Sequence, residues 1–300
     1  MTIKQSVVAL LVVALLVALP YLVSESMTNA AIQMLIAALF ATAFSLLCGQ
    51  AGMLSFGHAA YFGLGSFAAV HAMNAFGGEA GVSSFRMPAW GFDFGSTTEV
   101  YYLALAWVVG SILLLFLLTL TPFGRVTVGL RENTHRLRFL GYNVHVLGTL
   151  VFAISAMFAG IAGALQAINI EAANYVVFEA GISTAVVLNS FIGGVGTFFG
   201  PAIGAAAMTF FGHVTSDVTR SWLLYQGLIF VLVIMFLPRG LVGEAVERFR
   251  NPKGTGISLG HALGRLVALL VTANHAATRT LWQLRLAYRK SISEASGCML

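Results

Sequence analysis

The sequence contains very little charge. Of its 300 residues, 9% are Asp, Glu, Lys or Arg and 58% are hydrophobic, with a mean hydropathy of +0.88. A soluble domain usually has about 25% charged residues, so an ordinary soluble fold is excluded. The net charge of +5 does not indicate nucleic-acid binding, because the basic residues flank apolar runs. Anionic lipid and membrane topology explain them better. We therefore predict an integral membrane protein that contacts lipid and binds no nucleic acid.

Groups that carry chemistry are also scarce. The two cysteines, Cys48 and Cys298, have neither metal-ligand spacing nor an evident disulfide partner. No catalytic triad, carboxylate pair or metal site can be assembled from the sequence. It also lacks the phosphate loop G-x-x-x-x-G-K-[ST], so the chain is not expected to bind ATP in that way. We predict neither an enzyme nor a resident metal or cofactor.

Long apolar runs separated by polar loops fill most of the chain. They predict an all-α polytopic membrane protein with about eight transmembrane helices. The predicted spans are residues 6–23, 29–48, 59–76, 100–120, 147–168, a short segment ending near 192, 197–214 and 222–237. The first run could instead be a cleaved signal, and residues 193–204 could re-enter the membrane rather than cross it.

The distribution of positive charge predicts the orientation. Lys4, residues 125–138 and the chain after Pro238 are basic and are expected in the cytoplasm, whereas residues 77–99 and 169–182 have excess acid. Both termini are therefore predicted to be cytoplasmic. Residues 1–243 would form the transmembrane domain. Residues 244–300 would form a basic cytoplasmic tail, either a helix lying on the membrane surface or a partly disordered segment.

Two glycine-rich segments interrupt the apolar runs at corresponding places in two pseudo-repeated halves. They are Gly49-Gln50-Ala51-Gly52-Met53-Leu54-Ser55-Phe56-Gly57-His58 and Gly193-Gly194-Val195-Gly196-Thr197-Phe198-Phe199-Gly200. Each glycine weakens a helix by about 1 kcal/mol relative to alanine, and paired interruptions of this kind point to a transporter's substrate site. The predicted substrate-pathway residues are Gly49, Gln50, Gly52, Ser55, Gly57, His58, Gly193, Gly194, Gly196 and Gly200.

Such a site would use backbone rather than charged side chains. No Asp, Glu, Lys or Arg lies inside a predicted span, which argues against a proton-coupled carrier. Half-helix ends can hold a small zwitterion or polar neutral molecule, with Ser55 and His58 as additional partners. Two structural alternatives stay open. The glycines, Gly200 and Gly204 above all, could serve close helix crossing, and a histidine near a helix end is more often an interface or capping residue.

The most charged internal segment is residues 125–146. Its first part predicts a short amphipathic helix that presents charged side chains to a partner, although a solvated positive-inside loop would have the same composition. The residues predicted to dock a partner are Arg125, Arg131, Glu132, Asn133, Arg136 and Gly141.

Taken together, these motifs resemble the permease subunit of the branched-chain (hydrophobic) amino-acid ABC importer family. The resemblance rests on residues 49–63, 124–141 and 159–165, is extended by 193–201 and 237–241, and covers about residues 29–243. It implies a bacterial inner-membrane permease that works with a sister permease, two cytoplasmic ATPases and an extracytoplasmic solute-binding protein. Residues 131–141 would be the coupling loop in a cleft of an ATPase, and the ATPases would bind the ATP. Two alternatives are the same architecture importing urea or short amides, and a stand-alone secondary carrier.

Overall fold

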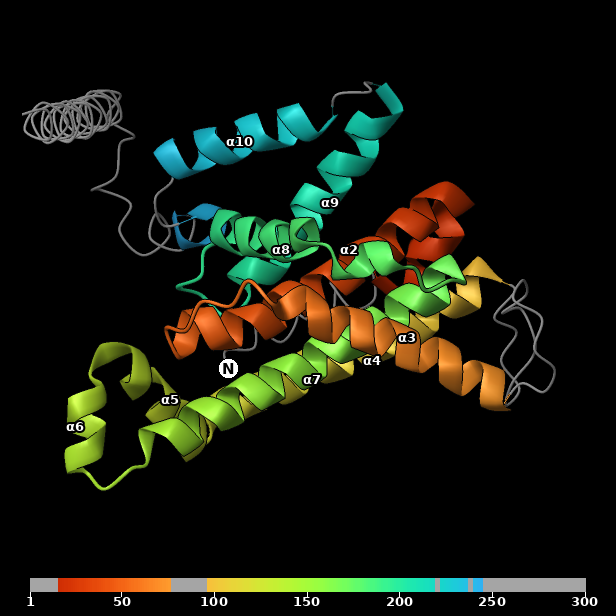
Figure 1. Cartoon of the computed structure of the whole chain (residues 1–300). Helices are drawn as coiled ribbons and strands as arrows, with labels where there is room; N and C mark the ends of the chain where they lie inside the picture. The colour runs from red at the N-terminus through yellow and green to blue at the C-terminus, as the bar shows by residue number, and fades with distance from the viewer. Residues whose placement is uncertain (1–15, 77–95, 219–221, 237–239, 245–300) are drawn as a thin grey trace, which may run out of the picture. The chain divides into compact units, whose positions relative to one another are not determined.

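The computed structural model describes residues 16–76, 96–218, 222–236 and 240–244, all within one compact unit, residues 1–247. Within these ranges the regular elements are all helices, which confirms the all-α prediction (Figure 1). Besides helical residues at 16–22 and 240–244, they are α2 (Glu25–Ser45), η1 (Leu46–Gln50), α3 (His58–Phe76), α4 (Thr97–Leu120), α5 (Pro122–Glu132), α6 (Thr134–Phe139), α7 (Val144–Ile170), η2 (Tyr175–Phe178), α8 (Ala180–Gly193), α9 (Gly200–Val218) and α10 (Trp222–Phe236). The predicted tail, residues 244–300, lies outside the described residues except for Glu244.

Three described helices are long and apolar enough to cross a membrane: α2 continued by η1, α4 and α7. At 1.5 Å per residue the 27 residues of α7 extend about 40 Å, against a hydrocarbon core of about 30 Å. The predicted spans 29–48, 100–120 and 147–168 coincide with these helices to within about one turn. By contrast, α8 has 14 residues and is only about 21 Å long. The total number of crossings therefore stays a prediction.

Local capping signals determine where the connecting helices begin. The Thr121 hydroxyl accepts a hydrogen bond from the Gly124 N–H, and Pro122 occupies the first helical turn of α5. Asn133 caps α6 through the Arg136 N–H at 3.0 Å, and Asn143 caps α7. The sequence pair Thr121-Pro122 therefore lies both at the end of α4 and at the start of α5.

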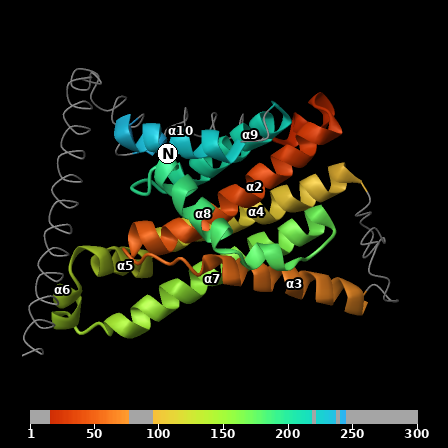
Figure 2. The same ribbon diagram turned by 45° about the horizontal axis from the view of Figure 1, so that its top comes forward.

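The helix bundle is built around α2 and around a close pair formed by α3 and α7. α2 packs against α4, α7, α8 and α9, and α3 lies alongside α7 (Figures 1 and 2). A Cβ atom on Gly163 would run into the carbonyl group of Phe62, and one on Gly65 would meet the backbone of Gly160. Small residues on α3 and α7 therefore allow the two helices to approach closely.

Glycines also bring α8 and α9 into close contact. A Cβ on Gly204 would meet the backbone of Gly193 and the carbonyl oxygen of Asn189, and Gly200 lies equally close to the end of α8. Both positions therefore have the packing role that the sequence left open as an alternative. Gly196 differs, because it is exposed and a Cβ atom added to it would have no described neighbour within 4 Å.

Candidate functional site at the helix breaks

The first predicted break is confirmed between α2 and α3. The last turn of α2 widens into the π-helical turn η1, residues 51–57 are not helical, and α3 begins at His58. Gly52, within this segment, has a φ of +72°, a left-handed conformation that favours glycine. The N–H of Met53 donates to the Leu47 carbonyl at 3.1 Å. Single π-turns of this kind are frequent at functional sites.

The second break is also confirmed, and it meets the first. α8 ends at Gly193, and Gly194 has a φ of +102°. A Cβ atom on Gly49 would lie 2.7 Å from the Val195 carbonyl oxygen and 3.1 Å from Val195 Cγ1. Only a glycine at position 49 therefore permits this approach. The structure thus brings the two glycine-rich segments together, although they are far apart in the sequence.

Arg131 of α5 joins this junction to the predicted docking segment. Its Nη1 donates a hydrogen bond to the Gly49 carbonyl oxygen at 2.6 Å. Carbonyls at the C-terminal end of a helix lack helical partners, and the helix dipole favours a cation there. Arg131 also lies beneath Gly52, where a Cβ atom would be 3.0 Å from its Cγ. The guanidinium of Arg131 is therefore directed at the break.

His58 lies at the start of α3 in a fully buried polar contact. Its Nε2 lies 2.8 Å from Ser155 Oγ, and that hydroxyl donates its proton to the Ala43 carbonyl at 2.6 Å. Because Ser155 has only one proton, Nε2 must be the donor in the contact with His58. The same assignment leaves Nδ1 as an acceptor, and it has no partner among the described residues. His58 thus ties α3 to both α2 and α7.

The start of α3 lies well inside the bundle. Ser155 is eleven residues after the first residue of α7, a distance of about 16 Å along the helix. The first N–H groups of α3 are therefore at mid-depth if α7 spans the membrane. One of them, the Ala59 N–H, donates to the Ser183 hydroxyl of α8 at 2.9 Å. A residue of the second half thus caps the helix that follows the first break.

Several predicted residues lie outside these contacts. Gly57 is exposed, Ser55 is half-buried, and Gln50 Oε1 is buried without a described partner. No group of three His, Cys, Asp or Glu side chains that could hold a metal occurs in the described ranges. Sequence reasoning missed Ser155 and Ser183, whose only signal is a hydroxyl in an apolar helix.

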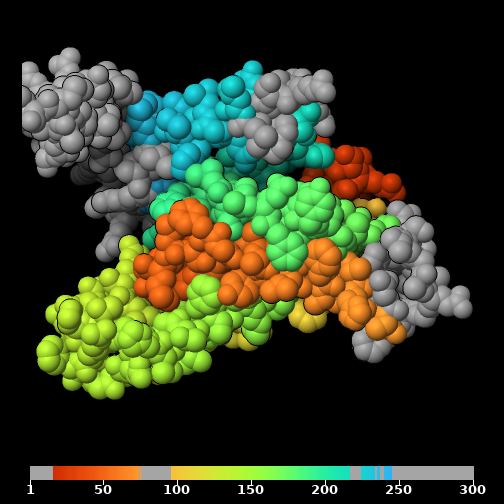
Figure 3. Space-filling model, in the orientation of Figure 1, coloured from red at the N-terminus to blue at the C-terminus, as the bar shows by residue number. Residues whose placement is uncertain are grey.

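The predicted docking segment folds into α5 and α6. In Figure 3 these helices, coloured yellow-green, form a lobe, and α5 packs against α4, α7 and η1. Gly141, with a φ of +86°, ends α6. The charged or polar members of the predicted set are exposed: Arg125, Arg131, Glu132, Asn133 and Arg136. The sequence analysis did not single out two neighbouring apolar side chains, Phe139, which is 91% exposed, and Leu140, which is 67% exposed.

Comparison with known proteins identifies the family. A family model described as the permease component of a branched-chain amino acid transport system matches residues 75–238, more than half of the chain. The chain belongs to this family. It is 30% identical over 146 residues to the high-affinity branched-chain amino acid transport system permease protein LivM of Escherichia coli (strain K12). The LivM protein of Salmonella typhimurium (strain LT2) matches to the same extent.

These matches are partial. Each alignment covers 48% of this chain and 34% of the relative, so the chain spans about a third of the length of the curated relatives it matches. No solved structure matches significantly. The family model includes the α5–α6 lobe and the second break, but it begins after the first break. The importance of residues 49–57 therefore rests on the contacts described above.

Proposed function

We propose that this chain is a membrane-spanning permease subunit of an ATP-driven importer for branched-chain or other hydrophobic amino acids. It would lie in the bacterial inner membrane with both termini in the cytoplasm. A sister permease, two cytoplasmic ATPases and an extracytoplasmic solute-binding protein would complete the importer, and the ATPases would bind ATP. Support comes from the family membership and from the transport function that the names of the LivM relatives state.

The hydrogen bond between Arg131 and Gly49 is the observation that supports ATP coupling most directly. It connects α5, in the lobe proposed to contact an ATPase, to the point where the two helix breaks meet. A displacement of α5 would therefore pull on the end of α2 and on the chain between α2 and α3. This arrangement suits a permease in which rigid parts rock around a central site.

The surface of the lobe suits a protein partner. Phe139 and Leu140 project into solvent beside the basic residues Arg136 and Arg138. Exposed aromatic and arginine side chains are typical anchors of protein interfaces. The expected partner surface is an apolar pocket with an acidic rim, because such a rim would complement the basic side chains.

Co-purification and reconstitution test this function together. The full chain would be purified in mild detergent from native membranes, and the co-purifying proteins identified by mass spectrometry. We expect a second permease and two ATPases, and ATP-dependent uptake of leucine when the complex is placed in vesicles with its binding protein. Uptake of urea instead of leucine would show that the importer's cargo is urea. Uptake by this chain alone along an ion gradient would contradict the proposal and favour a secondary carrier.

A further inference from the structure

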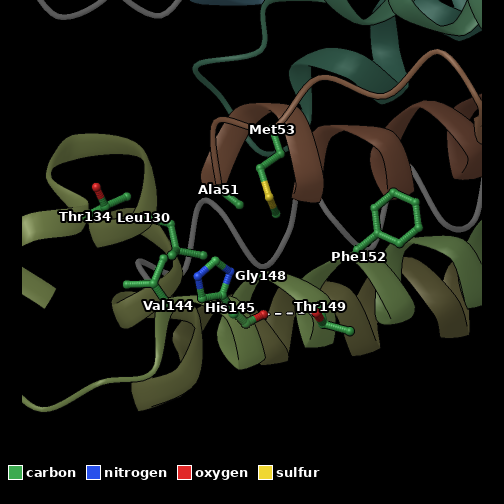
Figure 4. A pocket seen from close by; sticks show the side chains of 9 residues that line it. All are labelled: Ala51, Met53, Leu130, Thr134, Val144, His145, Gly148, Thr149 and Phe152. Carbon is green, nitrogen blue, oxygen red and sulfur yellow. Dashed lines mark hydrogen bonds between the residues drawn. The ribbon is translucent and has the colours of Figure 1, made fainter. Parts of the chain in front are cut away.

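A cavity of about 420 Å³ opens between the first helix break and the base of the α5–α6 lobe (Figure 4). Cavities of about 300–1,000 Å³ are typical of small-molecule sites. The residues that line it come from the turn after α2, from α5 and α6 and from the first turns of α7. They are Ala51, Met53, Leu130, Thr134, Val144, His145, Gly148, Thr149 and Phe152.

The lining is mostly apolar and carries no carboxylate, Lys or Arg. Met53 reaches from the turn toward α7, where Gly148 leaves room for it: a Cβ atom there would lie 3.6 Å from Met53 Sδ (Figure 4). The polar groups are Thr134, His145 and Thr149, and the Thr149 hydroxyl already donates to the His145 carbonyl at 2.9 Å. Such a lining fits a short aliphatic group with a neutral or zwitterionic head, and it offers no fixed charge for an anionic lipid headgroup or a nucleotide.

One wall of the cavity also packs against the buried start of α3. Phe152 forms part of its wall and packs edge-on against the ring of His58, with 5.8 Å between ring centroids. Leu130, on the opposite side, is the residue before Arg131. The cavity therefore extends from the lobe proposed to contact an ATPase to Phe152, which also packs on the start of α3. A cargo that leaves the first helix break toward the lobe would pass this position.

From this position and lining, the geometry points to a release subsite that binds the aliphatic side chain of a hydrophobic amino acid. This subsite would lie on the side of the permease that carries the α5–α6 lobe. This inference rests on the proposed importer function and adds to it the location of a subsite for the cargo. Met53, Val144 and Phe152 contact the aliphatic group, and Gly148 supplies the space. The exposed rim leaves the ammonium and carboxylate groups of the amino acid in water.

Photo-labelling of the complete importer tests this subsite. Membrane vesicles containing the full chain and its partners are illuminated with a diazirine analogue of leucine, and labelled peptides are mapped by mass spectrometry. We expect adducts within residues 51–53 and 144–152 that excess leucine suppresses and excess aspartate does not. Gly148→Leu fills the cavity and should reduce these adducts about tenfold, the effect of roughly 1.4 kcal/mol. Gly110→Leu is the matched control, because a Cβ atom added there would have no described neighbour within 4 Å.

The outcomes separate this inference from the importer function. Leucine-suppressible adducts that fall elsewhere, in vesicles that still take up leucine with ATP, would refute the subsite and leave the importer function standing. Labelling of the cavity that leucine does not suppress, but that a diazirine fatty acid reproduces, would identify a lipid chain as its occupant and also refute the subsite. Absence of ATP-dependent leucine uptake by the unmodified complex would contradict both proposals.

Discussion

Replacing Arg131 by methionine removes the hydrogen bond to the Gly49 carbonyl while keeping a flexible apolar stem. A hydrogen bond from a charged group contributes about 1.5–3 kcal/mol to stability, and an exposed ion contributes at the lower end of such ranges. Arg131 is an exposed residue, so we take about 1.5 kcal/mol, which corresponds to roughly a tenfold change in an equilibrium. If the bond exists in only one of two rocking states, its loss shifts their ratio by that factor.

The expected result is uncoupling. Arg131→Met should insert, assemble with its partners and support ATP hydrolysis, because the methionine side chain still packs beneath Gly52. Uptake of leucine per ATP hydrolysed should fall about tenfold, since α5 would move without carrying the end of α2. The assay measures phosphate release and labelled leucine in the same proteoliposomes.

The control removes the same charge elsewhere in the lobe. Arg138 is exposed on α6, and its side chain makes no hydrogen bond to the described residues. Arg138→Met should therefore keep the ratio of uptake to hydrolysis, even if it weakens ATPase docking. An unchanged ratio in Arg131→Met would refute the reasoning and reduce the contact to a local stabilising bond.

Three further substitutions test other parts of the structure. Gly52→Ala should lower the free energy of unfolding by about 1–2 kcal/mol, because φ is +72° there and the new Cβ would meet Arg131. Leucine uptake into vesicles should fall, and normal uptake would show that the turn is not needed. Gly163→Leu should prevent α3 from packing on α7 and lower the thermal unfolding temperature in detergent, whereas Gly110→Leu should not; equal temperatures would contradict the proposed packing. Phe139→Ser should leave that temperature unchanged but weaken binding of the ATPase by about 2 kcal/mol, or roughly thirtyfold, which the amount of co-purified ATPase measures. Full retention of the ATPase would place the docking anchor elsewhere.

Features encoded by neighbouring residues could be predicted from the sequence. The breaks at Gly49–Gly57 and Gly193–Gly196 follow from glycines that weaken a helix locally. The amphipathic helix α5 follows from the charges after Pro122, and it begins three residues before the charged segment that starts at Arg125. The limits of α4 and α7 extend at most three residues beyond the predicted runs, since caps lie just outside apolar segments.

Contacts between distant segments could not be predicted in this way. The charge of Arg131 suggested a partner or solvent, yet its guanidinium binds a carbonyl 82 residues earlier in the chain. The hydroxyls of Ser155 and Ser183 have no pattern around them, and only the fold reveals that they hold His58 and the start of α3. The exposure of Phe139 likewise depends on where α6 ends. No local rule gives the distance between such residues.

The backbone contact between α3 and α7 makes the pair a single lever. At Gly65 and Gly163 backbone lies directly against backbone, with no side chain between to absorb movement. The start of α7 follows α6 after only four residues. If the lever pivots near Ile170, a tilt of about 10° moves the start of α7 by about 7 Å and the first turn of α3 by about 4 Å. The displacement is therefore largest beside the α5–α6 lobe and smallest near Ile170. One tilt could thus open the lobe side while the opposite side stays closed.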